Sequence, residues 1–222
     1  MTIENTLRHR KSCRAFLDRR VDNKLLRTII GQASRAPSNG NLQPWEIFVL
    51  TGSALASLKV ATCDAIAQNH PMSTPEYAVY PKPLKPLFDA RRFAIGEDIY
   101  KVLGIARDDK AGRRAQFAKN ALMFNAPVGL FAYIDRSLSY GQWMDLGMFL
   151  QSLMLVCEDH NLASCAQGYW TFFHDTVRAA TGAPDNLMLA CGVAIGFEDT
   201  EAPINRVHSA RATIDEFATF ID

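Results

Sequence analysis

The sequence predicts a sandwich of helices around a few-stranded sheet, in either an α/β or an α+β arrangement. Segments with apolar residues at helical spacing alternate with short runs of β-branched and aromatic residues, and this alternation is typical of sheets covered by helices. Hydrophobic residues make up 48% of the 222-residue chain, which is enough for a sizeable core. Because no repeat or low-complexity stretch divides the chain, residues 1–222 are expected to form one domain.

The first regular elements follow from capping and spacing. Asp22 is expected to cap a helix whose apolar residues, from Leu25 to Ala33, recur at helical spacing. This helix should stop near Ala36, because Pro37 disfavours a helical conformation in the residue before it. The elements expected next are a turn, a strand and a helix, over residues 38–41, 46–50 and about 53–67.

Proline interrupts the pattern in the middle of the chain. Five prolines fall between residues 70 and 86, so a loop is expected there, and a loop of this length is usually functional or mobile. Beyond the loop, the same spacing rules predict regular elements up to the C-terminus. The expected helices cover about 88–104, 109–124, 145–159, 174–181 and 214–221, and the expected strands cover 128–134, 163–167 and 187–196.

Charge and motif content exclude several classes of function. The 24 basic and 23 acidic residues give a net charge of +1, whereas a nucleic-acid-binding protein usually has a strong basic excess. The sequence has no dinucleotide-binding glycine motif, no phosphate-binding P-loop and no serine-hydrolase elbow. The five histidines lack the spacing of metal ligands. No nucleic-acid partner and no metal site are therefore expected.

The sequence also favours a cytoplasmic protein that does not enter a membrane. The N-terminal residues are polar and acidic, without the apolar stretch of an export signal. The apolar runs 146–157 and 187–197 are too short to cross a bilayer. The five cysteines are scattered and form no C-x-x-C pair, which is typical of reduced thiols that act as small hydrophobic side chains.

A basic segment near the N-terminus is the first candidate for chemistry. Four cationic side chains and a hydroxyl fall within residues 8–14, where the cations repel one another unless an anion is bound. Arginine offers phosphate a planar fork of donors, and lysine offers a compact charge. Taken alone, however, the segment is better explained as a solvated basic face near a helix end.

Two further segments are richer in polar or small residues than a plain connection needs. Residues 36–45 offer amide side chains, a hydroxyl and free backbone N–H groups, which suit the polar edge of a heteroaromatic ring. Residues 163–168 end in a turn of small residues, which lets the backbone approach a flat ligand. An ordinary helix-to-strand loop remains the alternative for the first segment.

The order and spacing of these segments resemble the FMN-dependent nitroreductase family. Arg10-Lys11-Ser12-Cys13-Arg14 is followed about two dozen residues later by the Ala36–Trp45 segment, and further matching segments begin at Asn125, Asp145, Cys191 and Arg211. The resemblance covers nearly the whole chain and is weakest at about 64–115, where the family varies most. It implies an α+β three-layer sandwich with a few-stranded, mostly antiparallel sheet. It also implies a homodimer with two FMN sites at the subunit interface.

The resemblance further implies that both ends of the chain hold the FMN phosphate. Arg10, Lys11 and Ser12 would bind the phosphate and the ribityl chain, and Arg211 would close on the phosphate from the C-terminal segment. Arg14 would lie near flavin N1 and the C2 carbonyl, where the reduced ring gains negative charge. Lys11 stands where the family more often has a second arginine, which removes a bidentate fork but keeps the charge.

Two turns would complete the implied flavin site. The residues are Pro37, Ser38, Asn39 and Asn41 from the partner subunit, and Ala166, Gln167 and Gly168 along the flavin ring, where one backbone N–H reaches towards N5. Ala166 departs from the proline that is common at its position, which leaves the local backbone geometry open. Arg206 is a second basic candidate near the C-terminus, ranked below Arg211 because only Arg211 matches the family's pattern.

The family's activity implies a ping-pong reaction. NADH or NADPH would reduce the flavin and leave, and a small electron-poor acceptor such as a nitroaromatic would then be reduced in the same place. No catalytic side chain is required and none is assigned. Residues 70–100 either roof this pocket or form an ordinary surface insertion. The open alternatives are reductive dehalogenation, enone reduction or flavin cleavage at the same site, and a flavin-binding module without turnover.

Overall fold

The fold is built on a four-stranded sheet. The computed structural model describes residues 2–68 and 72–221. The strands are β1 (Trp45–Thr51), β2 (Val128–Asp135), β3 (Ala163–Gln167) and β4 (Leu187–Gly196). They pair in the order β1-β2-β4-β3, and each neighbouring pair is antiparallel. The few-stranded, mostly antiparallel sheet implied by the resemblance is therefore confirmed.

Side chains of β2 are buried on both faces of the sheet, because successive residues of a strand point to opposite sides. Leu130 and Ala132 belong to one hydrophobic core, and Phe131 and Tyr133 belong to the other. All four side chains are fully buried. Strand β2 is thus covered on both sides, as its continuous apolar sequence predicts.

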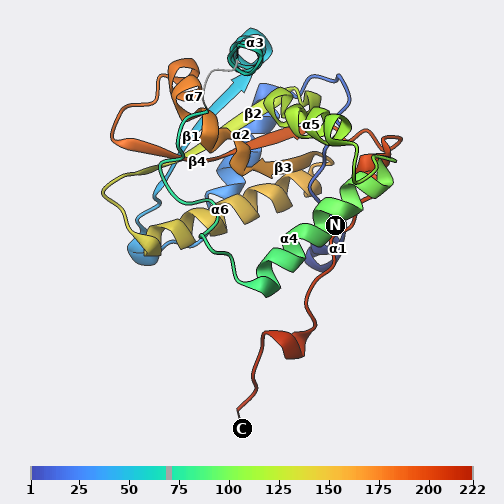
Figure 1. The fold of residues 1–222 in the computed structure, drawn as a ribbon. Helices are drawn as coiled ribbons and strands as arrows, with labels where there is room; N and C mark the ends of the chain where they lie inside the picture. Colours follow the sequence, from blue (N-terminus) through green and yellow to red (C-terminus); the bar gives the residue numbers. More distant parts are fainter. Residues whose placement is uncertain (1, 69–71, 222) are drawn as a thin grey trace.

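Helices cover each face of the sheet and make three layers (Figure 1). One face packs on α2 (Asn23–Ala33) and α6 (Tyr140–Asp159), and the opposite face packs on α3 (Gly52–Ala67) and α7 (His174–Thr181). The side chain of Asp22 accepts hydrogen bonds from the backbone N–H groups at the start of α2, which confirms it as the N-cap. The chain is an α+β sandwich, as implied.

Three helices lie at or beside the basic segment of the N-terminus. They are α1 (Ile3–His9), α4 (Pro86–Val102) and α5 (Lys110–Ala118). No residue of α4 is fully buried, although the helix is 17 residues long. Figure 1 shows α4 beside α1 and the start of the C-terminal tail, and side chains of α1 and α4 line a common cavity.

Two of the expected helices are wrong in part. The helix expected over 109–124 ends at Ala118, and the following 3-10 segment (Lys119–Asn125) contains left-handed backbone conformations that an α-helix cannot include. The helix expected over 214–221 is only a 3-10 turn, Ile214–Glu216. A short helix needs packing to be stable, whereas this tail extends away from the sandwich (Figure 1).

Smaller differences concern helix ends and the central loop. Helix α2 ends at Ala33, before the expected stop near Ala36. Helix α6 begins at Tyr140 rather than at 145, because Ser139 and Gln142 form a capping box there. Residues 72–85 contain no helix or strand, as the prolines predict, while residues 70 and 71 of the expected loop lie outside the described residues. Helix α1 was not expected.

Gly192 of β4 should not tolerate a side chain. A Cβ built on Gly192 would lie 2.5 Å from Cδ1 of Trp170, and this indole is fully buried edge-on against Phe131. Because the indole is rigid, Gly192→Ala is expected to lower the free energy of unfolding by about 1–3 kcal/mol. Chemical denaturation measures the effect, with Gly31→Ala as the matched control because nothing lies within 4 Å of a Cβ there. Equal stability of the two variants would contradict this close packing.

Candidate functional site

The basic N-terminal segment is held in place by backbone hydrogen bonds to distant parts of the chain. The N–H of Cys13 donates to the carbonyl oxygen of Ser164 in β3 at 3.0 Å. The N–H of Arg14 donates to Oδ1 of Asn205 at 2.8 Å, and Nδ2 of Asn205 donates to the carbonyl oxygen of Ala15 at 2.8 Å. Asn205 is only 2% exposed. This amide, which the sequence analysis missed, joins the two ends of the chain.

The joined ends enclose a cavity of about 290 Å³. Its lining includes Arg10, Lys11, Ser12 and Arg211, which the resemblance assigns to the phosphate end, and also Arg14, which the resemblance assigns to the flavin ring. Arg206 is not among the described residues that line it. The lining residues that the sequence analysis did not assign are Leu7, Arg8, Ile95, Val207, His208 and Ser209. A cavity with this many cationic side chains suits a compact anion such as a phosphate.

Some of these cations already have acidic or carbonyl partners. Nζ of Lys11 lies 2.8 Å from Oε1 of Glu198, which offsets part of the lysine charge. Nη1 of Arg211 donates to the hydroxyl oxygen of Ser209 at 2.6 Å, and this contact adds no negative charge. Arg8 is likewise paired with Glu4 at 2.7 Å. The attraction for an anion therefore comes mainly from Arg10, Arg14 and Arg211.

Arg14 connects the cavity to two adjoining hollows under α4. One hollow, of about 90 Å³, lies between Arg14 and Asn120. The other, of about 900 Å³, also includes Arg211 and Phe217. Side chains of α4 line all three spaces. This helix therefore forms the wall opposite the basic segment, and the half-buried Arg14 faces each space in turn.

Ala166 and Gln167 belong to β3, so of the three residues expected in a turn only Gly168 lies beyond the strand. The buried Gln167 side chain lies between the exposed Ala166 and the half-buried Gly168. Gln167 is 3% exposed; its Nε2 donates to the carbonyl oxygen and to Oδ1 of Asn120, at 3.1 and 3.0 Å. Its Oε1 accepts from Nε1 of Trp170 at 3.3 Å. The Gln167 side chain thus points into the protein, so only its backbone can face a ligand. The local sequence pattern holds no signal for Asn120, which lies 47 positions away.

The turn over residues 37–41 lies elsewhere in the single chain. None of its residues is among the described lining of the basic cavity. The N–H of Asn39 donates to Oδ1 of Asp145 at 3.1 Å, and the hydroxyl of Ser38 accepts from the N–H of Gln43 at 3.0 Å. Asp145 is 2% exposed, and its Oδ2 accepts no hydrogen bond from the described residues. An acid inside an apolar helix was the available signal for this missed anchor.

Cys13 lies within the basic segment but should be chemically inert. Burial raises the pKa of its thiol to about 12, and Sγ donates to the carbonyl oxygen of Ala15 at 3.1 Å. Since the thiolate is the reactive form, iodoacetamide at pH 8 is expected to leave Cys13 unlabelled in the native protein and to label it after denaturation. Peptide mass spectrometry distinguishes the two states. Labelling of the native protein at the unfolded rate would contradict the burial of this thiol.

A model of the nitroreductase family matches residues 7–197. The chain belongs to this family. The match confirms the resemblance seen in the sequence motifs, and it includes both the basic segment and the turn after β3. Within residues 2–68 and 72–221, no helix of this nitroreductase-family chain has both the length and the apolar character needed to span a membrane.

Relatives and solved structures agree with this membership. Over 219 residues the chain is 32% identical to a chloronitrobenzene nitroreductase of Comamonas testosteroni, covering 99% of this chain and 96% of that protein. It is similar to the crystal structure of the FMN and NADPH-dependent nitroreductase NfnB of Sphigopyxis sp. strain HMH, with a TM-score of 0.96, 45% identity and full coverage of both chains. For the crystal structure of the FMN-dependent NfnB of Mycobacterium smegmatis in complex with NADPH, the TM-score is 0.93 and the identity is 30%. That match covers 99% of this chain and 97% of the other chain. These structures confirm the nitroreductase fold.

Proposed function

We propose that this protein is an FMN-dependent oxidoreductase that uses NADH or NADPH to reduce electron-poor acceptors such as nitroaromatics. One observation carries the proposal: the cavity that gathers Arg10, Lys11, Ser12 and Arg14 from one end of the chain and Arg211 from the other. The phosphate of FMN is an anion of charge near −2 at neutral pH, so it would relieve the repulsion among these cations. The named relatives, which reduce chloronitrobenzene or depend on FMN and NADPH, support the cofactor and the acceptor class.

The residues of the chain have binding and electrostatic roles in this proposal. Bound FMN would supply the two-electron chemistry, accepting hydride at N5 from the nicotinamide and passing it to the acceptor in ping-pong order. Arg10, Ser12 and Arg211 would hold the phosphate end. Arg14, at the junction of the three hollows, would stabilise negative charge on the reduced ring. We assign no general acid or base.

We further propose that the active form is a homodimer in which the turn at Pro37, Ser38, Asn39 and Asn41 completes the site of the partner. In one chain this turn is absent from the lining of the basic cavity. Large apolar side chains on α6 and on the tail are exposed, including Tyr140 at 89% and Ile221 at 90%, and a second copy would cover them. Light scattering is expected to give a dimer. A monomer with full FMN occupancy would contradict the interfacial site.

Steady-state oxidation of NADH and NADPH with a nitroaromatic acceptor tests the activity. We expect acceptor-dependent oxidation of the nicotinamide that is lost when the flavin is removed and restored by added FMN. Absence of oxidation with every acceptor, in a protein that binds FMN, would instead indicate a flavin-binding module without turnover. The single-domain organisation of residues 1–222 and a cytoplasmic location stay predictions.

A further inference from the structure

The loop that leads into α4 is fixed to the body of the protein at its first residues. The N–H of Ser73 donates to the carbonyl oxygen of Phe172 at 2.9 Å, and its hydroxyl donates to Oδ2 of Asp175 at 2.9 Å. The ring of His174 bonds through Nε2 to the carbonyl oxygen of Thr74 at 3.2 Å. These contacts contrast with α4 itself, in which no residue is fully buried.

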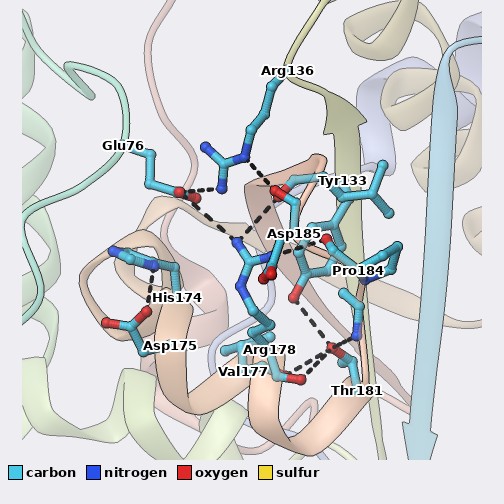
Figure 2. A network of polar contacts seen from close by, with 12 residues as sticks. Glu76, Tyr133, Arg136, His174, Asp175, Val177, Arg178, Thr181, Pro184 and Asp185 are labelled. Carbon is cyan, nitrogen blue, oxygen red and sulfur yellow. Dashed lines mark hydrogen bonds and ion pairs between the residues drawn. The ribbon is translucent and has the colours of Figure 1, made fainter.

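Glu76 adds an attachment in which both partners are charged (Figure 2). Its carboxylate is ion-paired with Arg136, just after β2, and lies 3.8 Å from Nη2 of Arg178 on α7. The Glu76 side chain is 17% exposed. Both arginines also bind the chain that precedes β4: Nε of Arg136 donates to the carbonyl oxygen of Asp185 at 2.7 Å, and Nη1 of Arg178 donates to that of Pro184 at 2.9 Å.

The two guanidinium groups are therefore held near Glu76 by contacts that do not depend on it. If the carboxylate were removed, both cations would stay in a partly buried place, and the side chain of Asp185, which is fully exposed, would be a weak substitute. Breaking one partner of a partly buried charge pair costs more than the pair contributes, because the remaining charge loses its partner. The loop should therefore open more often than in the wild type, although its contacts at Ser73 and Thr74 remain.

The attached loop reaches the turn after β3 within three residues of Glu76. The hydroxyl of Tyr77 donates to the carbonyl oxygen of Ala190 at 2.5 Å, and its ring lies 4.8 Å from the ring of Trp143 between centroids. Val79 follows, and a Cβ built on Gly168 would lie 3.5 Å from its Cγ1. Val79 thus packs directly on the turn that the family resemblance places along the flavin ring.

We propose that Glu76 is a positioning residue for the reaction. Its ion pairs with Arg136 and Arg178 hold residues 73–79 against the turn at Gly168, and this sets the wall of the pocket where the acceptor binds. Glu76 does not touch the basic cavity, so FMN phosphate binding should not depend on it. The expected effect on the acceptor KM rests on the proposed function, whereas the expected effect on the position of the loop rests on the contacts alone.

The test compares Glu76→Gln with the wild-type holoenzyme, and uses Glu201→Gln as a control at an exposed glutamate. Glu76→Gln keeps the size of the side chain but removes its charge. We expect hydrogen exchange of the amides in residues 72–80 to become about tenfold faster, as for the loss of a charge-assisted hydrogen bond. The KM for the nitroaromatic acceptor should rise several-fold, while kcat and FMN content stay within about twofold. In Glu76→Asp, which keeps the charge, the acceptor KM should lie between those of Glu76→Gln and the wild type.

Two outcomes would overturn the proposal. One is unchanged exchange and unchanged acceptor KM in Glu76→Gln. The other is loss of FMN together with a fall in kcat, which would indicate general destabilisation. If Glu76→Gln does not fold, Arg136→Gln removes one of the two cations, and unchanged exchange and KM in that variant would equally overturn the proposal. A wild-type protein that fails to oxidise NADH or NADPH would refute the proposed function, whereas the exchange measurement would still decide whether Glu76 holds the loop.

Discussion

Arg10→Ala is expected to weaken FMN binding about 10- to 100-fold, and Arg211→Ala about tenfold. A hydrogen bond to a charged group contributes more than a neutral one, and its loss from a partly buried site gives an effect of this order. Arg10 is half-buried and Arg211 is exposed, so solvent screening makes the second effect smaller. Fluorescence titration of the apoprotein with FMN measures both dissociation constants.

Arg206→Ala is the matched control for these two variants. Arg206 has the same charge and lies in the same C-terminal segment, but it is not among the described residues that line the cavity. Its replacement should change FMN affinity by less than about twofold, because Arg206 is exposed and salt screens a surface charge that does not contact the phosphate. If Arg206→Ala weakened FMN binding more than Arg211→Ala, the ranking of Arg211 above Arg206 as a phosphate ligand would be wrong. Unchanged flavin occupancy in both Arg10→Ala and Arg211→Ala would refute the phosphate assignment.

Arg14→Gln should lower kcat about 10²- to 10³-fold, with a smaller effect on FMN retention. Removing one donor that stabilises developing negative charge typically costs this much, and Arg14 is the cation of the cavity that also faces the adjoining hollows. Stopped-flow reduction of the bound flavin by NADPH separates this step from acceptor binding. Arg14→Lys keeps the charge without the planar fork, so it should recover part of the rate.

The outcome that would contradict this role is a reduction rate in Arg14→Gln equal to that of the wild type. A variant that merely loses its flavin would give normal rates once FMN is added in excess, and this distinguishes binding from charge stabilisation. The backbone N–H of Arg14 holds Asn205, and either substitution keeps that contact.

Two of the strands, β3 at the sheet edge and β4 inside the sheet, were predictable from sequence because their pattern is local. Residues 187–196 and 163–167 form the expected strands with unchanged bounds, since each is a short segment bounded by turn-forming residues, which favours a strand over a helix. The expected helix over 214–221 failed because its apolar residues have no face to pack on in this chain. The break after Ala118 was also hidden, since Met123, Phe124 and Asn125 adopt left-handed conformations without any glycine to announce them.

The site residues that lie within family motifs were predictable from sequence. The residues that position them through long-range contacts were not. Arg10, Ser12 and Arg211 were found from their motifs, and they do line one cavity. The residues that position them were missed because their partners are far away in sequence: Asn205 bonds to Arg14 across 191 positions. A buried amide or acid of this kind resembles an ordinary loop residue until the fold brings its partner close.

The most direct measurement is the identity and amount of the flavin in the purified protein. The protein should be yellow, and denaturation should release FMN, recognised by its mass, at about one molecule per chain because each cavity offers a single phosphate site. A colourless preparation that also fails to bind added FMN would contradict the assignment of the cavity between Arg10 and Arg211.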